Sequence, residues 1–541
     1  MSGSSMSLTG GEWVVRALGA EGVRHVFGIP GVHNLAIYDA LLKQSEITHV
    51  LARHEQGAAF MADGYARASG RPGVVLVTTG PGATNTLTPL VESYAGSQPV
   101  LALMSDIAAP LIGRDLGALH EVPNQIECFR PVCRRAETIL EAHAIPGAIG
   151  RAFDLFEASR PGPVALSLPN DLLATRTEAR LSHGARRRPD CDARLIDEAA
   201  RVLSGARRPL IIAGGGAIAA GAAVDLQALA RRLGAPVLTT VMGRGIMAET
   251  DPLWLGVLPN KRASQEAIEA ADVILAVGCR FAHRSTQGLL LNLAFRPEQK
   301  LIHLDLDPAV IGKMHRPAVG IVGDARAGLR GLLEALGRSA PATAWDREWL
   351  ARKRAARAPR YTETVDRLIR MLRETLAVDA IVVNDQTGLN YWMEWHFPVL
   401  GPRTFLYPVG SATLGYAVPA AIGAKVAHPG RQVIAVAGDG GFLFSVNELA
   451  TAVKYGLGIV FLVLNDQRYG AIKYLQEGLF GRWGEADLAN PDFPALARAF
   501  GAEGERVERL DDLPRALEKA LGHPGPTLLE VPVAIDPPWE L

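Results

Sequence analysis

The last third of the chain sets an acidic residue and an amide residue at the ends of two consecutive apolar runs. The run RQVIAVA precedes Gly438-Asp439-Gly440, and the run GIVFLVL precedes Asn465-Asp466. The segment between them, FSVNELATAVKYG, has helical spacing. A strand, a helix and a second strand in this order form a crossover, which makes the two strands parallel. We therefore expect Asp439 and Asn465 at the same carboxyl edge of one sheet, where open α/β folds bind ligands.

A carboxylate and an amide oxygen at this edge suit a hard cation. Mg²⁺ usually takes one or two carboxylates and fills its octahedron with phosphate oxygens, and flanking glycines let a diphosphate approach the backbone. Taken alone, a Gly-Asp-Gly after a strand is often only a turn, and an Asn there is often only a cap. Their order and spacing within one unit favour a site for a metal-bound diphosphate.

The amino-terminal half carries a second series of motifs: GIPG at 28–31, RHEQGAA at 53–59, GYARA at 64–68 and TGPGATN at 79–85. Glu55 falls where the strand THVLARH gives way to the helix QGAAFMADGYARA. A carboxylate at a helix start can be a simple match to the helix dipole, worth at most about 1 kcal/mol. That explanation does not account for the neighbouring motifs.

Together these motifs closely resemble the thiamine diphosphate (ThDP) enzymes, in their group of acetolactate synthase-like enzymes and 2-oxo acid decarboxylases. PGPVALSLPNDL, RPLIIAGGGA, KLIHLDLDPAVIGK and SATLGYAVPAAIGAK also occur in the family's order, so the resemblance covers nearly the whole chain. It implies an α/β fold of three doubly wound parallel-sheet domains. We place a pyrimidine-binding domain at 1–180, a middle Rossmann-like domain at 190–338 and a diphosphate-binding domain at 358–541. The 541 residues suit about three domains.

The resemblance also implies roles for individual residues. Glu55 would bond N1′ of the aminopyrimidine and drive the ring to its imino tautomer. Leu414 would prop ThDP in a bent conformation, and the Ala412 carbonyl would accept a hydrogen bond from the 4′-amino group. Asp439, Asn465 and the carbonyl of Gln467 would bind Mg²⁺. The other residues expected to contact the cofactor are Gly388, Leu389, Gly440 and Gly441, through amides to the diphosphate, together with Pro30, Asn85, Gly438, Tyr469 and Gly470.

The middle domain has a weak nucleotide signal. Gly214-Gly215-Gly216-Ala217 follows the strand PLIIA and matches a dinucleotide fingerprint only loosely. Members of the family hold FAD here, or ADP, or nothing. Acetolactate synthases usually show an acidic pair after GxRF, where this chain has Ala282-His283. Bound FAD is therefore possible but not favoured.

The expected reaction follows from ThDP, which adds to a 2-oxo acid carbonyl and takes up the electrons left by CO₂. The resulting enamine is either protonated, which releases an aldehyde, or attacks a second carbonyl to give a ketol. Leu475 stands where acetolactate synthases carry a tryptophan that favours the larger second substrate. The sequence ends with VAIDPPWEL, which leaves little for a long C-terminal cap. We favour a decarboxylase with carboligation as a side activity. One alternative is an acetolactate synthase-type carboligase. A more remote one is a catalytically dead relative that acts in binding or assembly. The presence of Glu55, Asp439 and Asn465 argues against this last alternative.

His120, in GRDLGALHEVPNQ, is the second candidate catalytic residue. Acetolactate synthases usually place Gln here, before the Glu matched by Glu121, and some decarboxylases of the group carry a similar Leu-His-Glu. With an ordinary pKa near 6.5, histidine can deliver a proton at neutral pH where an amide cannot. Protonation would favour aldehyde release. The alternative is that His120 only replaces one hydrogen-bonding side chain with another.

Composition narrows the remaining choices. The 56 basic and 56 acidic residues balance, which gives no reason to expect nucleic-acid or acidic-membrane binding. No apolar run reaches the roughly 20 residues of a membrane span. The four cysteines lack metal-finger spacing, and the opening residues lack the features of a secretion signal, so we expect a cytoplasmic protein. The resemblance implies a homodimer or homotetramer, in which the domain of Glu55 meets the domain of Asp439 in a neighbouring chain.

Overall fold

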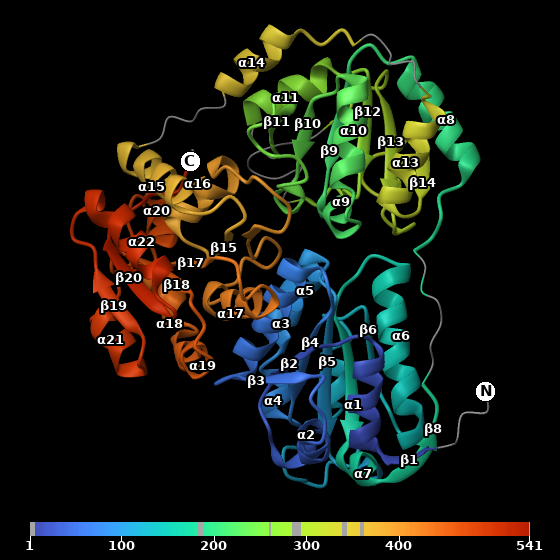
Figure 1. Ribbon diagram of the computed structural model, residues 1–541, viewed down its shortest axis with the longest axis vertical. Coiled ribbons are helices and arrows are strands. Elements are labelled where there is room, and N and C mark those ends of the chain that lie inside the picture. The colour runs from blue at the N-terminus through green and yellow to red at the C-terminus, as the bar shows by residue number, and fades with distance from the viewer. Residues whose placement is uncertain are drawn as a thin grey trace.

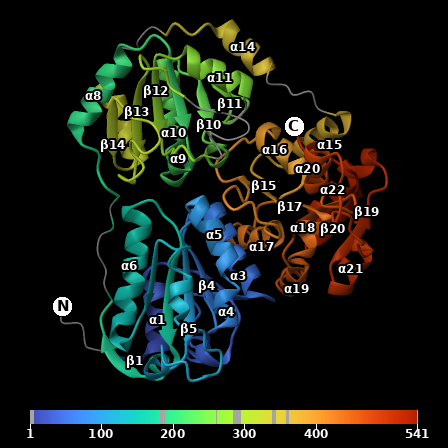
Figure 2. The same cartoon turned by 180° about the vertical axis from the view of Figure 1, so that it is seen from behind.

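The computed structural model describes residues 6–181, 186, 188–258, 261–283, 294–337, 343–356 and 362–539. Within them, three six-stranded sheets follow one another along the chain, and every pair of neighbouring strands in them is parallel. Helices cover both faces of each sheet, and the three units form three lobes (Figures 1 and 2). The fold class predicted from the sequence is confirmed. The domain limits 1–180, 190–338 and 358–541 remain predictions.

The first lobe, blue to teal in Figure 1, contains the motifs around Glu55. Its strands, in the order of the sheet, are β3 (Thr48–Leu51), β2 (His25–Gly28), β4 (Gly73–Val77), β5 (Val100–Asp106), β7 (Val164–Pro169) and β6 (Arg135–Thr138). Its helices are α1 (Gly10–Ala20), η1 (Val32–Asn34), α2 (Leu35–Leu42), α3 (Glu55–Ser69), α4 (Pro81–Thr84), α5 (Leu87–Gly96), η2 (Ala109–Leu111), η3 (Gln125–Cys128), η4 (Ala142–Ala144), α6 (Ile145–Ala158) and α7 (Asn170–Ala174). A separate antiparallel pair joins β1 (Met6–Thr9) to β8 (Arg176–Ala179). Because the chain runs from β2 outward to β3 and then returns to β4, the strand order reverses between β2 and β4.

The second lobe, green to yellow, is the middle unit. Its strands, in sheet order, are β11 (Trp254–Val257), β10 (Val237–Thr239), β9 (Pro209–Ala213), β12 (Val273–Val277), β13 (Lys300–Asp305) and β14 (Val319–Val322). Its helices are α8 (Ala193–Ser204), α9 (Gly215–Ala219), α10 (Ala223–Leu233), η5 (Val241–Gly243), α11 (Lys261–Ala270) and α13 (Ala325–Ala335). Helix α14 (Arg347–Ala356) lies on the connection to the third lobe (Figure 1).

The third lobe, orange to red, contains the Gly-Asp-Gly element. Its strands, in sheet order, are β16 (Phe405–Leu406), β15 (Ile381–Asn384), β17 (Val433–Gly438), β18 (Val460–Asn465), β20 (Thr527–Pro532) and β19 (Glu503–Arg506). Its helices are α15 (Glu363–Thr375), α16 (Gly388–His396), α17 (Ala417–Ala427), α18 (Asp439–Leu443), η6 (Val446–Glu448), α19 (Leu449–Lys454), α20 (Gly470–Phe480), α21 (Phe493–Phe500), η7 (Leu510–Asp512) and α22 (Leu513–Gly522). The predicted strand-helix-strand unit is present: β17 and β18 are parallel neighbours, and their core positions are buried on both faces, as in a covered parallel sheet.

The first and third lobes pack directly through α3 and α17, which lie side by side at the centre of Figure 1. Two glycines allow this close approach. A Cβ on Gly64 would lie 2.2 Å from the carbonyl oxygen of Ala420, and one on Gly423 would lie 2.0 Å from that of Met61. The glycines of the GYARA and AAIGAK motifs are therefore required by helix packing rather than by a ligand.

A buried network of charged side chains lies at this contact between the first and third lobes. Arg67 pairs with Asp63 at 2.5 Å and with Glu92 at 2.9 Å, and all three side chains are at most 3% exposed. Tyr416, next to α17, donates its hydroxyl to Asp63, and Ser411 donates its amide to Glu92. The charged groups all belong to the first lobe, and the hydrogen bonds from Tyr416 and Ser411 connect them to the third.

Arg186 and Arg188, between the first and second lobes, form ion pairs with distant residues. Arg186 pairs with Glu21 and Asp154 of the first lobe. Arg188 pairs with Glu157 of the first lobe and Asp324 of the second, so it bridges them. The partners lie far away in sequence, which hides the pairing from local inspection.

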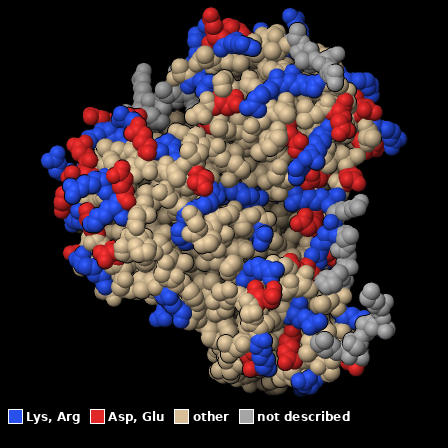
Figure 3. Space-filling view, in the orientation of Figure 1, with Lys and Arg blue, Asp and Glu red and all other residues tan. Residues whose placement is uncertain are grey.

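On the face drawn in Figure 3, basic and acidic side chains are interspersed rather than gathered by sign. A largely uncharged area lies where Figure 1 places α17 and α4. None of the helices in the described ranges has the length and apolar character needed to cross a bilayer.

Candidate functional site

Glu55 begins α3, and its surroundings come from both lobes. Its Oε2 accepts a hydrogen bond of 3.0 Å from Asn85 Nδ2. The turn before it is tied to the third lobe, because the amides of Arg53 and His54 donate to the buried carboxylate of Glu448. Gly57 leaves room for that carboxylate, since a Cβ there would lie 2.1 Å from Glu448 Oε1. Glu55 and Asn85 are thus brought together as half-buried groups at one edge of the first sheet.

His120 lies over the turn that follows β4. Its Nδ1 is 3.2 Å from the carbonyl oxygen of Thr79. Its backbone is left-handed, with φ at +64°, and a Cβ on Gly80 would lie 2.4 Å from the His120 carbonyl oxygen. A non-glycine residue in this conformation costs on the order of 1 kcal/mol and persists only where its surroundings enforce it. Pro30, by contrast, lies exposed in the loop after β2.

The predicted metal ligands converge at the end of the third sheet. Gly438 pairs in register with Leu464, so Asp439 and Asn465 follow at the same level. One amide group reaches both: Asn490 Nδ2 is 2.7 Å from Asp439 Oδ2 and 3.1 Å from Asn465 Oδ1. Two oxygens that meet at one donor can also meet at one cation, so this donor set fits Mg²⁺.

Neighbouring groups orient these ligands. The Asn465 amide donates to the buried carboxylate of Glu530 at 2.7 Å, which turns its oxygen toward Asp439. Gln467 has a left-handed backbone, with φ at +56°, and its carbonyl accepts the amide of Leu488. Burial raises the pKa of Asp439, with a smaller contribution in the same direction from Asp466. A buried carboxylate with a raised pKa has an unmet need for positive charge, which a metal ion would supply.

The glycines around Asp439, at the start of α18, allow neighbouring side chains to pack close to the backbone. A Cβ on Gly440 would lie 2.6 Å from the ring of Tyr469, and one on Gly441 would lie 2.8 Å from Asp385 Oδ1. Asp385 is fully buried, and this burial raises its pKa to about 6 although it accepts hydrogen bonds from several backbone amides. Gly388 and Leu389 begin the neighbouring helix α16, after β15. The strand order reverses between β15 and β17, so these amides lie at the switch point where such sheets bind phosphates.

The remaining predicted residues flank this region. Leu414 is half-buried, near the position that a Gly441 side chain would take. Ala412 is exposed and left-handed, with φ at +54°. Tyr469 and Gly470 lie at the start of α20, with Tyr469 against Gly440. The third-lobe residues predicted to contact the cofactor thus gather at the switch-point edge of one sheet.

Two groups of site residues stay apart in the structure. We call Glu55, Asn85 and His120 the Glu55 group, and Asp439, Asn465 and Asn490 the Asp439 group. Within the described parts of the chain, no hydrogen bond or ion pair connects Glu55, Asn85 or His120 to Asp439, Asn465 or Asn490. The Glu55 group belongs to the first lobe, and the Asp439 group belongs to the third. The groups that sequence inspection missed are Asn490, Glu530, Asp385, Glu448 and His33. Of these, His33 stands just after the motif GIPG, and Glu448 lies within the helical segment FSVNELATAVKYG.

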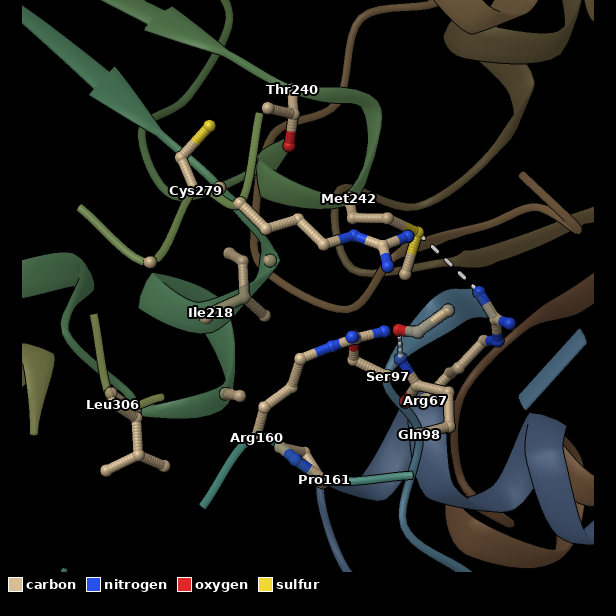
Figure 4. A pocket seen from close by; sticks show the side chains of 18 of the residues that line it. Arg67, Ser97, Gln98, Arg160, Pro161, Ile218, Thr240, Met242, Cys279 and Leu306 are labelled. Atoms are coloured by element: carbon tan, nitrogen blue, oxygen red, sulfur yellow. Dashed lines mark hydrogen bonds between the residues drawn. The ribbon is translucent and has the colours of Figure 1, made fainter. Parts of the chain in front are cut away.

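A separate pocket lies between the three lobes (Figure 4). Arg160 extends into it and donates to Ser97 Oγ at 2.7 Å, while Arg67 contacts Met242 across it. Burial lowers the pKa of Arg160 to about 10, with Arg280 and Arg134 contributing in the same direction. Neither Arg160 nor Arg280 forms an ion pair within the described residues, so the pocket suits an anionic group.

The glycine run at 214–216 borders this pocket, but packing explains two of its glycines. A Cβ on Gly214 would lie 2.1 Å from the carbonyl oxygen of Gly278, and one on Gly216 would lie 2.8 Å from the Gly278 Cα. Close contact between the ends of β9 and β12 therefore requires both. The pocket can accept an anion without distinguishing FAD from ADP, and the expectation that FAD is possible but not favoured stays a prediction.

Comparison with known proteins agrees with this geometry. The thiamine pyrophosphate enzyme profiles match in chain order: the N-terminal TPP binding domain over 8–128, the central domain over 196–332 and the C-terminal TPP binding domain over 366–531. The chain belongs to the thiamine pyrophosphate enzymes, in the group of acetolactate synthase-like enzymes and 2-oxo acid decarboxylases.

Individual relatives cover nearly the full chain. It is 40% identical to the probable 2-ketoarginine decarboxylase AruI of Pseudomonas aeruginosa over 534 residues, 97% of this chain and 94% of that protein. It is 36% identical to the probable acetolactate synthase large subunit of Methanocaldococcus jannaschii, over 98% of this chain and 92% of that protein. It is 34% identical to the acetolactate synthase isozyme 2 large subunit of Escherichia coli K12, over 97% of this chain and 96% of that protein.

Proposed function

We propose that this chain is a ThDP- and Mg²⁺-dependent decarboxylase of a 2-oxo acid, which releases an aldehyde. The observation that carries the cofactor assignment is the convergence of Asp439 and Asn465 on one point at the switch point of the third sheet. Asp439, Asn465 and the Gln467 carbonyl would hold Mg²⁺, and the amides at the starts of α16 and α18 would face the diphosphate. A cytoplasmic location is part of the proposal.

When bound, ThDP supplies a nucleophilic carbon and an electron sink for the lost CO₂. The chain's own residues hold and move protons around it. Glu55, oriented by Asn85, can exchange a proton with the aminopyrimidine. His120 carries a hydrogen on Nδ1, because the Thr79 carbonyl can only accept, and Nε2 is then the nitrogen that gains and loses a proton. We propose that this proton goes to the carbon that has lost CO₂, which favours aldehyde over ketol.

The side chain of the 2-oxo acid substrate is to be determined with a panel of compounds. The Pseudomonas aeruginosa relative is named a probable 2-ketoarginine decarboxylase, which makes a guanidino 2-oxo acid the first compound to test. A panel that varies the side chain from methyl to branched, aromatic and cationic should give CO₂ and aldehyde in equal amounts from at least one member. A panel that yields neither product with ThDP and Mg²⁺ present would refute the decarboxylase.

The second candidate is an acetolactate synthase-type carboligase, which the identities to two acetolactate synthase large subunits favour. That reaction consumes two 2-oxo acid molecules for each CO₂ released. The ratio of 2-oxo acid consumed to CO₂ therefore separates the candidates: it is near one for the decarboxylase and near two for the carboligase.

Replacing His120 should alter the product rather than the loss of CO₂. We expect His120→Gln to lower aldehyde formation by at least about tenfold, because the amide cannot deliver a proton. Release of CO₂ in a first turnover should persist, and the ketol fraction should rise. Rapid quench followed by product chromatography measures both. Unchanged product ratio and rate would make His120 a structural residue.

We further propose that the working unit is a homodimer or homotetramer whose sites are shared between chains. Apolar side chains lie exposed beside each half-site: Leu116 and Leu119 near His120, and Leu479 and Phe480 on α20, all at least 62% exposed. Helix α20 has no buried residue among its eleven. A second copy that covers these side chains would bring the Asp439 group of one chain to the Glu55 group of the other.

Complementation tests this sharing. Glu55→Gln chains and Asp439→Ala chains, each inactive alone, should regain part of the activity when mixed, because each mixed dimer would contain one site with neither substitution. Subunit exchange is verified separately with differently tagged chains. Mixed dimers that form yet stay inactive would contradict shared sites.

A further inference from the structure

A second histidine, His33, lies beside His120. It belongs to η1, directly after β2, and its ring centroid is 5.5 Å from that of His120, at an interplanar angle of 54°. Only 9% of its surface is exposed. His33 follows β2 and Thr79 follows β4, so both stand where the strand order of the first sheet reverses. This is the edge at which doubly wound sheets bind ligands.

Thr79 connects the two rings. Its hydroxyl oxygen is 2.9 Å from His33 Nδ1, and its carbonyl oxygen accepts from His120 Nδ1. The hydroxyl is also 3.1 Å from Ser105 Oγ, and Thr79 is fully buried. Both imidazoles are therefore attached through Nδ1 to one immobilised residue. A change at His33 reaches His120 through a single backbone position.

Charged groups near His33 and His120 shift the pKa of His33. Asp106, at the end of β5, is the carboxylate that faces His33, and Glu121 in turn faces Asp106. Burial lowers the pKa of His33, and the positive charge of His120 lowers it further, while Asp106 partly opposes both. Two rings at this separation resist holding a proton each at the same time. A proton on His33 is therefore disfavoured both by burial and by a proton on the neighbouring His120.

We propose that His33 is a positioning residue for His120, and that the two rings act through Thr79 as one unit that keeps the transferable proton on His120 Nε2. The inference rests on the proposed function, in which that proton reaches the carbon that has lost CO₂. In the step, the N–H bond at Nε2 breaks and leaves its electron pair on nitrogen. The C–H bond forms with the pair left behind by CO₂, and a proton from solvent then restores His120.

A double-mutant cycle tests the coupling. His33→Leu removes both the ring and the bond to Thr79, and should lower aldehyde formation about three- to tenfold and raise the ketol fraction. His33→Asn, which can still bond the Thr79 hydroxyl, should recover part of the loss. In the His120→Gln background, His33→Leu should change the product ratio no further. If the effects of His33→Leu and His120→Gln on the product ratio multiply in the double variant, His33 acts independently of His120 and the proposal is wrong.

The exposed His143, whose side chain is 61% exposed, provides the matched control. His143→Gln should leave rate and product ratio unchanged. Circular dichroism and thermal unfolding identify variants that do not fold; His33→Asn, the milder substitution, then replaces His33→Leu in the cycle.

A titration separates failure of this inference from failure of the proposed function, because it needs no turnover. Histidine-labelled protein is titrated by NMR, and the His33 signal is assigned by its loss in His33→Asn. Since a positive His120 lowers the pKa of His33, the substitution His120→Gln should raise that pKa. An unchanged His33 titration would refute the coupled pair even in an active decarboxylase. A raised pKa would support the pair even if no tested 2-oxo acid were decarboxylated.

Discussion

Asp439→Ala should abolish retention of ThDP and, with it, activity. Asp439 is the only carboxylate among the proposed metal ligands, and it is 2% exposed. The proposed Mg²⁺ links the diphosphate to the protein, so loss of this ligand should cost on the order of several kcal/mol of binding free energy. Isothermal titration calorimetry with ThDP at saturating Mg²⁺ measures the change.

The exposed Asp487, in the loop near Gln467, provides a control for general effects of removing a carboxylate. Its side chain is 57% exposed and pairs only loosely, at 3.6 Å, with Lys473. Asp487→Ala should bind ThDP about as tightly as the unchanged chain. If Asp439→Ala binds ThDP as tightly as the unchanged chain does, the proposed metal site is wrong.

Glu55→Gln should still bind ThDP but should exchange the proton of the reactive thiazolium carbon orders of magnitude more slowly. The amide keeps the shape of the side chain and can still meet Asn85, but it cannot pass a proton to and from the aminopyrimidine. Quenched-flow hydrogen–deuterium exchange, read by NMR of the released cofactor, gives the rate without any substrate.

Asn85→Ala is the matched comparison, since it removes the donor to Glu55 and leaves the carboxylate in place. It should slow the exchange far less than Glu55→Gln does. Equal exchange rates in the unchanged chain and in Glu55→Gln would mean that another group activates the cofactor.

The parallel direction of β17 and β18 and the two polar edge positions could be predicted because they are encoded locally. Asp439 and Asn465 each follow a continuous apolar run, and a helical crossover between two strands of one sheet makes them parallel. The motifs of the first lobe are similarly continuous, which is why Glu55 and the start of α3 coincide. Apolar periodicity and glycine turns act over a few residues, and the sequence shows them directly.

The contacts that orient these residues could not be predicted, because they join distant segments. Asn490 lies 25 residues beyond Asn465 in the polar stretch ADLANPDF, and Glu530 lies 65 residues beyond it on β20. Their roles depend on β20 pairing with β18, which no local pattern specifies. His33 stands next to a recognised motif, yet its relation to His120 depends on β2 and β4 being neighbours.

The role of some glycines could not be predicted from their neighbours in the chain. From the motif GYARA or the glycine run at 214–216 alone, contact with a ligand cannot be told from packing. Gly64 meets the backbone of α17, and Gly214 meets the backbone after β12, so close backbone approach accounts for both. Such contacts arise only once the helices and strands are assembled.

Reconstitution of the cofactor-free protein tests the central claim most directly. Protein stripped of metal and cofactor is supplied with ThDP, Mg²⁺, both or neither, and CO₂ and aldehyde are measured from the most active 2-oxo acid of the panel. CO₂ and aldehyde should appear in equal amounts only when both ThDP and Mg²⁺ are present, and not at all with Asp439→Ala. Undiminished CO₂ release without ThDP, or in the presence of a chelator that removes Mg²⁺, would contradict a ThDP- and Mg²⁺-dependent decarboxylase.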